Sequence, residues 1–218
     1  MTARIVTIAQ QKGGAGKTTI AAHLAVAWAQ SGLSVAVVDI DPQASLSSWW
    51  AMREEMGVPA PTGARGKGGL SVHRITGWRT ANEVEKLAKA HDVVVIDSPP
   101  HAETEAKIAV RSADLVVVPL QPSPMDFWAT KATLDLAAGE NTAALLVLNR
   151  VPPRARLTEA MTGKLKELGA KVAKGRIGNR VALAAALLEG LGVTEYQRTG
   201  SAAAEVKALA AEVLKAAG

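Results

Sequence analysis

Cysteine is absent from this chain of 218 residues. The protein therefore has no disulfide bond, no thiolate nucleophile and no thiolate ligand for zinc or an iron–sulfur cluster. Histidine does not replace it, because the four histidines lack the spacing of a metal site; they are His23, His73, His91 and His101. We expect each of them to be a surface or helix residue.

Long hydrophobic runs are also missing. A membrane-spanning helix needs about 20 consecutive apolar residues, and the sequence has no such run. The N-terminus has no charged and then apolar leader with a small-residue cleavage site, so we expect an unprocessed, cytoplasmic protein without stable membrane insertion. With 48% hydrophobic residues, the chain can bury a large core, and its length suits one compact domain over residues 1–218.

A glycine-rich turn follows the first apolar run. Residues 4–8 suit a buried strand, and residues 9–20 read Ala-Gln-Gln-Lys-Gly-Gly-Ala-Gly-Lys-Thr-Thr-Ile. Gly13, Gly14 and Gly16 let backbone N–H groups turn inward without Cβ clashes and form a nest for phosphate oxygens. A helix from Gly16 points its N-terminus at the same anion. The order of strand, loop and helix predicts a phosphate-binding loop.

Two side chains at the end of this loop suit a nucleotide with magnesium. Lys17 can reach the β- and γ-phosphates, and the Thr18 hydroxyl can bind Mg²⁺. The usual loop opens with a glycine five residues before its last glycine, whereas this chain has Gln11 there, followed by Lys12. Taken alone, Lys12 is either a solvated surface charge or a second lysine for a phosphate.

Three aspartates end apolar strands. Residues 35–40 lead to Asp39 and Asp41, and residues 93–96 lead to Asp97. The carboxyl ends of parallel strands lie at the ligand-binding edge of an open α/β sheet, so we expect these carboxylates beside the loop. An acid in the position of Asp97 can hold Mg²⁺ through water. Asp41 alone is also the residue type of a helix cap, because a proline follows it.

The sequence Lys-Gly-Gly-Ala-Gly-Lys-Thr-Thr, as a unit, resembles the deviant phosphate loop of the ParA/MinD family of P-loop ATPases. The resemblance covers nearly the whole chain, with its specific motifs at residues 9–20, 37–43, 93–100 and 149–150. It implies an α/β fold with a doubly wound, mostly parallel twisted sheet flanked by helices. It also implies ATP and Mg²⁺ as cofactors and slow hydrolysis of ATP.

The resemblance further implies roles for single residues. In that family the lysine at Lys12 crosses the interface of an ATP-bound homodimer to the partner's nucleotide, the aspartate at Asp39 supports the magnesium shell, and that at Asp41 positions the attacking water. Asn149, which alone would be a turn residue, is assigned to the adenine edge. The expected nucleotide-binding residues are Gly13, Gly14, Ala15, Gly16, Lys17, Thr18, Thr19 and Asn149. The expected catalytic residues are Lys12, Lys17 and Asp41, and the expected metal residues are Thr18, Asp39 and Asp97.

Hydrophobic periodicity predicts the remaining elements. Helices are expected at residues 18–31, 45–56, 81–90, 181–188 and 201–217, and further strands at 72–75, 115–120 and 143–149. Residues 57–70 are expected to be an irregular, mobile surface loop. Trp28 is expected in the core. Trp49 and Trp50 lie about 100° apart on a helix and cannot both point into one core, which leaves packing under the next loop or a partner surface for one of them.

Residues 121–128 predict the start of another helix. Ser123 suits its N-cap and Pro124 its first turn. This segment also resembles the family's loop near the nucleotide and the dimer face, with Asp126 and Trp128 as candidates for a role there.

Basic residues gather in one part of the chain. Between residues 150 and 180, nine lysines and arginines stand against two glutamates, a net charge of +7, whereas the whole chain carries +5. This asymmetry favours a polyanion partner. The segment has no aromatic residue for base stacking, so we expect phosphate contacts without base readout, as the resemblance to ATPases that bind DNA non-specifically also implies. The expected DNA contacts are Arg154, Arg176 and Arg180.

The resemblance predicts a ParA-type switch that partitions or positions a plasmid, a chromosome locus or a protein cluster. It would associate with the nucleoid when ATP-bound, and an activating partner protein would stimulate hydrolysis. We expect no helix-turn-helix module before the loop. A MinD-like membrane regulator is one alternative, although the apolar stripe of residues 201–217 has few bulky groups and favours docking on the core. A metabolic P-loop ligase is another, but it needs acids and bases outside the phosphate site.

Overall fold

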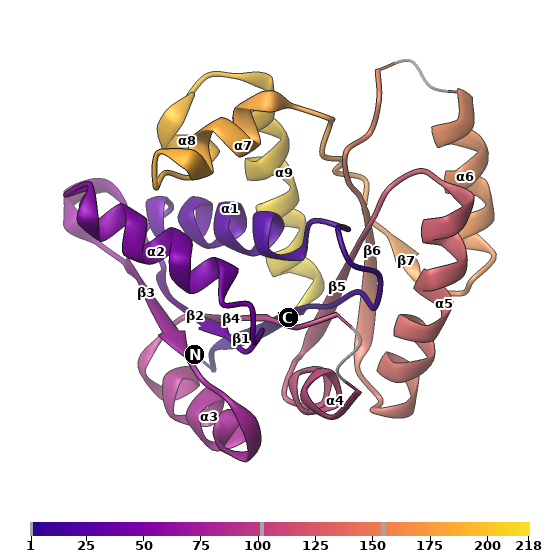
Figure 1. Ribbon diagram of the computed structural model, residues 1–218, viewed down its shortest axis with the longest axis horizontal. Helices are drawn as coiled ribbons and strands as arrows, with labels where there is room; N and C mark the ends of the chain where they lie inside the picture. Colours follow the sequence, from indigo (N-terminus) through magenta and orange to yellow (C-terminus); the bar gives the residue numbers. More distant parts are fainter. Residues whose placement is uncertain (1, 101–102, 154–155) are drawn as a thin grey trace.

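A parallel β-sheet forms the centre of the protein (Figure 1). The computed structural model describes residues 2–100, 103–153 and 156–218. The strand order is β3-β2-β4-β1-β5-β6-β7, and every pair of neighbours is parallel. The strands are β1 (Arg4–Ile8), β2 (Ser34–Asp39), β3 (Gly69–Arg74), β4 (Val93–Asp97), β5 (Leu115–Leu120), β6 (Ala143–Leu148) and β7 (Lys171–Val172).

Helices cover both faces of this sheet (Figure 1). On one face lie α1 (Lys17–Gln30), α2 (Ser45–Glu55) and α9 (Ser201–Ala216), and α7 (Val181–Leu188) and α8 (Val193–Tyr196) pack on the outer side of α1. The other packs against α3 (Thr80–Ala90), α4 (Glu103–Arg111), α5 (Pro124–Gly139) and α6 (Arg156–Lys166). This doubly wound α/β arrangement confirms the predicted fold class.

The central strands carry apolar side chains on both faces. Every residue of β4 and β5 is buried, as continuous β-branched strands of a parallel sheet require. The register places Asp97 of β4 beside Asp39 of β2 and beside Ile8 of β1. The carboxyl ends of these three strands therefore meet at one edge, where the phosphate loop begins.

Most elements lie where periodicity placed them, within three residues at each end. Residues 57–70 are less irregular than expected, because a short 3₁₀ turn (Ala64–Gly66) forms there and β3 already begins at Gly69. The structure adds α4, α6, α8 and β7, which we did not predict. Ser123 caps α5 as predicted, since its hydroxyl accepts a hydrogen bond from the Asp126 backbone N–H.

The tryptophans and the last helix serve the core. Trp28 is buried, and its indole N–H donates to the Ala210 carbonyl of α9 at 3.0 Å, which confirms the expectation. Trp49 is buried and Trp50 is half-buried against the same core. The apolar stripe of α9, including Val206 and Val213, is buried against the body of the protein, so α9 docks on the core as expected.

His23 links α1 to α7 and α8. Its Nδ1 accepts from the Val193 backbone N–H at 3.1 Å, so Nε2 carries the proton and donates to the Leu183 carbonyl at 3.2 Å. Burial lowers the pKa of this imidazole to about 4. The histidine is therefore a neutral link that fixes α7 and α8 on the helix that follows the phosphate loop.

Candidate nucleotide-binding site

The loop between β1 and α1 has the backbone of an anion nest. Gly14 and Gly16 adopt positive φ angles of 76° and 92°. A Cβ atom on Gly16 would stand 2.3 Å from Nδ2 of Asn149, so glycine is required there for both conformation and space. Gly16 precedes α1 and has no side chain to cap it, which leaves the first N–H groups of α1 available to a phosphate.

Asn149 braces this loop from the end of β6. Its side chain is buried, its Nδ2 donates to the Ala15 carbonyl at 2.8 Å, and its Oδ1 accepts from the Arg150 backbone N–H at 2.9 Å. The structure thus places the predicted base-recognition residue directly against the phosphate loop, where it holds the backbone of Ala15.

Lys17 and Thr18 begin α1 and face the acidic strand ends. Lys17 is buried, and burial lowers the pKa of its ammonium group, although the nearby charges of Asp97 and Asp41 act in the opposite direction. The Thr18 hydroxyl donates to Oδ2 of Asp97 at 2.7 Å. The loop lysine, the loop threonine and two of the predicted carboxylates therefore share one small region.

Asp97 is a buried carboxylate with a free oxygen. Burial raises its pKa to about 7; the bond from Thr18 opposes this shift, and the charge of Asp39 adds to it. Its Oδ1 is buried and has no hydrogen-bond partner within the described residues. An oxygen of this kind, beside a threonine hydroxyl, matches the hard oxygen ligands that Mg²⁺ prefers.

Asp39 is equally buried but fully hydrogen-bonded. Its Oδ2 accepts from both the backbone N–H and the hydroxyl of Ser47, at 2.8 and 2.7 Å, and its Oδ1 accepts from the Asp41 backbone N–H at 3.1 Å. Sequence reasoning placed Asp39 at this edge but missed Ser47, whose place in the first turn of a helix that follows an acidic strand end was the available signal.

Asp41 lies in the turn between β2 and α2. Its Oδ1 accepts from the Gln43 backbone N–H at 2.9 Å. The N-cap of α2 is Ala44, in the left-handed conformation, so Asp41 does not cap this helix. In the described part of the chain, no three His, Cys, Asp or Glu side chains are grouped to hold a metal by themselves. A magnesium ion that is bound jointly with nucleotide phosphates needs just one or two carboxylates.

Lys12 is held within its own chain by α5. Its Nζ donates to Oδ2 of Asp126, which also accepts from the hydroxyl of Ser123 at 2.7 Å. Burial acts to raise the pKa of Asp126, but the hydrogen bonds from Lys12, Ser123 and the Gln121 backbone outweigh it and keep that pKa below its ordinary value. Asp126 is therefore an ionised partner for Lys12.

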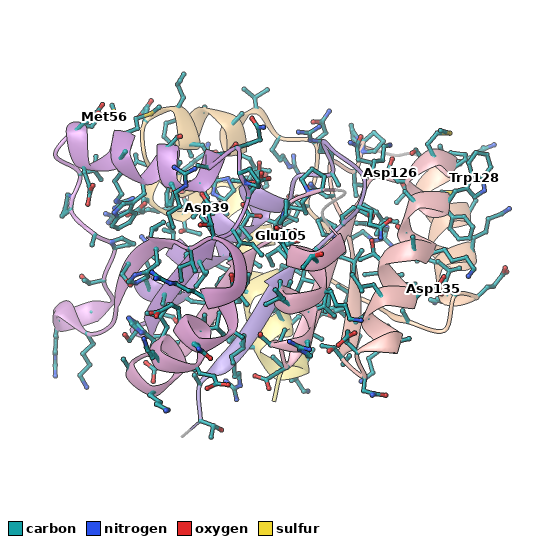
Figure 2. The ribbon with its side chains drawn as sticks, turned by 60° about the horizontal axis from the view of Figure 1, so that its bottom comes forward. Asp39, Met56, Glu105, Asp126, Trp128 and Asp135 are labelled. Atoms are coloured by element: carbon teal, nitrogen blue, oxygen red, sulfur yellow. The ribbon has the colours of Figure 1, made fainter. Side chains whose placement is uncertain are left out.

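The inner face of α5 continues this contact along the loop. Nε2 of Gln10 donates to Thr130 Oγ1 at 3.1 Å, and the backbone N–H of Gln11 donates to Thr133 Oγ1 at 3.2 Å. Trp128 has an exposed side chain on the same helix, and Figure 2 shows it at the periphery of the molecule while Asp39 lies near the centre. The entry to the phosphate loop is thus fastened to α5 over about two helical turns.

The basic segment is divided between two sides of the molecule. The lysines of α6 lie on one face of the sheet, whereas the loop that precedes α7 lies beside α9 on the other (Figure 1). Arg176 is exposed in that loop, and Arg180 is exposed but forms an ion pair with Glu205 at 2.6 Å. Arg154 lies outside the described residues.

Two glutamates of α9 hold this loop by its backbone. Glu212 accepts from the N–H groups of Lys174 and Gly175, both at 2.8 Å. Glu205 accepts from the Gly178 N–H at 3.0 Å. The path of residues 174–178 is therefore fixed by α9, and the basic side chains of the loop project from a defined backbone.

Comparison with known proteins agrees with this geometry. The family model described as CobQ/CobB/MinD/ParA nucleotide binding domain matches residues 6–193. Maintenance of carboxysome distribution protein A of Halothiobacillus neapolitanus is 31% identical over 222 residues, which cover 96% of this chain and 95% of that protein. The chromosome-partitioning ATPase Soj of Thermus thermophilus is 30% identical over 241 residues, which cover 97% of this chain and 95% of Soj.

Solved structures share the fold at lower identity. The septum site-determining protein MinD from Pyrococcus horikoshii, complexed with Mg-ADP, matches with a TM-score of 0.77 and 22% identity over 99% of this chain and 98% of that one. An ATP complex of a Cyanothece McdA variant matches with a TM-score of 0.75 and 18% identity over 99% and 96%. With its phosphate loop, its strand-end carboxylates and its parallel sheet, this chain belongs to the CobQ/CobB/MinD/ParA family of nucleotide-binding domains.

Proposed function

We propose that this protein is a ParA-type positioning ATPase. Residues 1–218 act as one domain that binds ATP with Mg²⁺, closes into a homodimer around two nucleotides, binds DNA without sequence preference and distributes a cargo. The observation that carries this proposal is the convergence of Lys17 with the carboxylates of Asp39, Asp41 and Asp97 at one edge of the sheet, on a loop that carries a second lysine, Lys12.

The nucleotide lies on the loop of residues 13–19 in this proposal. Backbone N–H groups and Lys17 hold its phosphates, and Asn149 keeps the loop in place beside the base. Thr18, Asp97 and Asp39 hold Mg²⁺, directly or through water. Bound Mg²⁺ supplies positive charge that neutralises the phosphate oxygens as the terminal phosphate leaves.

Hydrolysis depends on two further residues. Asp41 orients the attacking water, and Lys12 leaves Asp126 to contact the terminal phosphate in the partner protomer. Because Lys12 is already held by an ionised carboxylate, dimer closure exchanges one anionic partner for another, at a modest net gain. A slow basal rate and an activating partner protein suit this exchange.

DNA binds on the side of α9. Exposed basic residues lie on this helix and on the loops beside it, and their ammonium and guanidinium groups suit contacts with phosphates. They are Lys174, Arg176, Arg180, Arg198 and Lys207. Arg154 is a further candidate from the sequence. Dimer formation doubles this surface, so affinity depends on ATP and falls steeply with salt.

The names of the relatives support a positioning role. One is a protein for the maintenance of carboxysome distribution, and another is a chromosome-partitioning ATPase. We propose a cargo of this general kind, a DNA locus or a protein assembly, in a cytoplasmic protein that joins the nucleoid when ATP-bound. No helix in the described ranges is long and apolar enough to cross a membrane, and the apolar stripe of α9 is already covered.

Duplex DNA binding over a salt series tests this function. Wild type is expected to bind with ATP and not with ADP, Lys12→Ala not to bind, and Asp41→Ala to stay bound because it cannot hydrolyse. Arg176→Ala should lower affinity and reduce the salt dependence by about one phosphate contact. Lys86→Ala, an exposed lysine on α3, is the charge-matched control. Failure of every form to bind at low salt, with binding to anionic vesicles instead, would replace DNA by a membrane surface.

A further inference from the structure

The carboxylate of Asp39 is held on both oxygens by its own chain. Two N–H groups and one hydroxyl donate to it, from Asp41 and Ser47, at 2.7 to 3.1 Å. Among the described residues, the hydroxyl of Ser47 is the one side-chain donor. A hydrogen bond to an ionised carboxylate is stronger than a neutral one, so this serine contributes much of what fixes the orientation of Asp39.

We infer that Ser47 is a positioning residue for magnesium at this site, acting through Asp39; the inference rests on the proposed binding of nucleotide with Mg²⁺. The hydroxyl and the backbone N–H of Ser47 together fix one oxygen of the carboxylate, and the Asp41 N–H fixes the other. A carboxylate fixed in this way presents its remaining lone pairs in one direction, as an ordered magnesium shell requires.

The same contact closes the turn that carries Asp41. The Ala44 N–H donates to the Asp41 carbonyl at 2.8 Å, and the Gln43 N–H donates to its side chain. Residues 41–44 therefore form a tight turn, and Asp39 is attached to the chain on both sides of it, to the Asp41 N–H at its start and to Ser47 in the helix that follows. Loss of the hydroxyl loosens the Ser47 end and leaves the other contacts in place.

The far end of α2 provides a fixed frame for Ser47. Arg53 is buried, donates to both carboxylate oxygens of Glu195 at 2.7 and 2.8 Å, and donates to the Gly190 carbonyl at 2.9 Å. Because α2 is anchored there to α8 and to the turn before it, the helix that carries Ser47 is fixed in position. Through Ser47 and α2, Asp39 is thus held in a fixed position relative to the rest of the protein.

Nucleotide affinity, measured with and without magnesium, tests this role. Wild type, Ser47→Ala and Ser47→Thr are titrated with a fluorescent ATP analogue in excess EDTA and at a series of Mg²⁺ concentrations. Ser47→Ala should change the affinity for the ATP analogue in EDTA by less than about twofold. It should raise, about tenfold, the Mg²⁺ concentration at which half of the magnesium-dependent gain in affinity is reached, since a bond to a charged group is lost. Ser47→Thr, which retains the hydroxyl, should behave as wild type.

Ser48→Ala is the matched control. The hydroxyl of Ser48 donates to the Ala44 carbonyl at 2.9 Å, so this variant removes one hydrogen bond from the same turn without touching Asp39. An equal magnesium shift in both alanine variants, or an equal loss of affinity in EDTA for Ser47→Ala, would overturn the inference and make Ser47 a structural residue alone. Failure of the proposed function is separate, because it appears as absent ATP hydrolysis or DNA binding in wild type.

Discussion

Asp39 and Asp97 are neighbours in the sheet, and yet their surroundings differ. They are register partners on adjacent strands, and both are almost completely buried. Asp39 has three donors for its two oxygens, whereas Asp97 has one donor and a buried oxygen without a partner among the described residues. The comparison teaches that strand position brings an acid to the site and that its local donors determine what it does there: Asp39 anchors the turn, and Asp97 keeps an oxygen for a ligand.

Magnesium dependence of nucleotide binding gives the largest expected difference. Asp97→Asn removes the charge and one good metal oxygen, so the enhancement of ATP affinity by Mg²⁺ should fall about a hundredfold. Asp39→Asn changes a carboxylate whose two oxygens already accept hydrogen bonds from its own chain, so it should lower the enhancement only about tenfold. The measurement is the ATP dissociation constant with Mg²⁺ divided by that in EDTA. A larger loss for Asp39→Asn would reverse the assignment of anchor and ligand.

Without nucleotide, substitution of the two acids by asparagine should change the stability of the protein in opposite directions. Asp39→Asn turns an amide NH₂ group toward donors, so the free energy of unfolding in urea should fall by about 2 kcal/mol. Asp97→Asn removes a buried charge that accepts one hydrogen bond, and the amide can keep that bond from Thr18, so stability at pH 8 should rise by about 1 kcal/mol. Equal destabilisation by both substitutions would show that the two carboxylates are anchored alike.

The smallest expected effect is the pH dependence of the stability difference between Asp97→Asn and wild type. The pKa of Asp97 is raised from 3.8 to about 7 by burial, so native wild type holds this proton at a pH where the unfolded chain has lost it. The stability advantage of Asp97→Asn should therefore be smallest at pH 4 and grow to its full value above pH 7. Urea titrations of both proteins at four pH values would measure it.

His23 makes the stability of the protein depend on pH in the opposite direction, and it contributes equally to wild type and to Asp97→Asn. Its pKa is lowered to about 4, so the unfolded chain takes up a proton first as the pH falls from 6.5, and stability is lost in that window. Both proteins contain His23, and its contribution cancels in their difference. A difference that grows as the pH falls would contradict the direction assigned to Asp97.

The sequence predicts much of this site because its features are local. A strand, a glycine-rich loop and a helix occur in order around Gly16, and apolar runs end in Asp39 and Asp97, so the meeting of these groups follows from parallel pairing alone. The seven strands follow from the same runs, apart from β7, which has just two residues. Periodicity cannot indicate a strand that short.

Contacts between distant residues could not be predicted. Lys12 and Asp126 are 114 residues apart, and Asn149 and Ala15 are 134 apart. No spacing rule joins such pairs, because they meet when the fold brings the first turns of α5 and the end of β6 to the phosphate loop. The basic segment shows the same limit, since its charge could be counted along the chain while its division between α6 and the side of α9 depends on tertiary packing.

The hydrogen bonds between α9 and the loop of residues 174–178 determine which substitutions this part of the surface can tolerate. Glu205 and Glu212 hold backbone N–H groups, which every amino acid except proline provides. The side chains of Lys174 and Arg176 can therefore be exchanged without altering the path of the loop. Its charge can be adjusted by single substitutions, in either direction, while the framework that presents it stays unchanged.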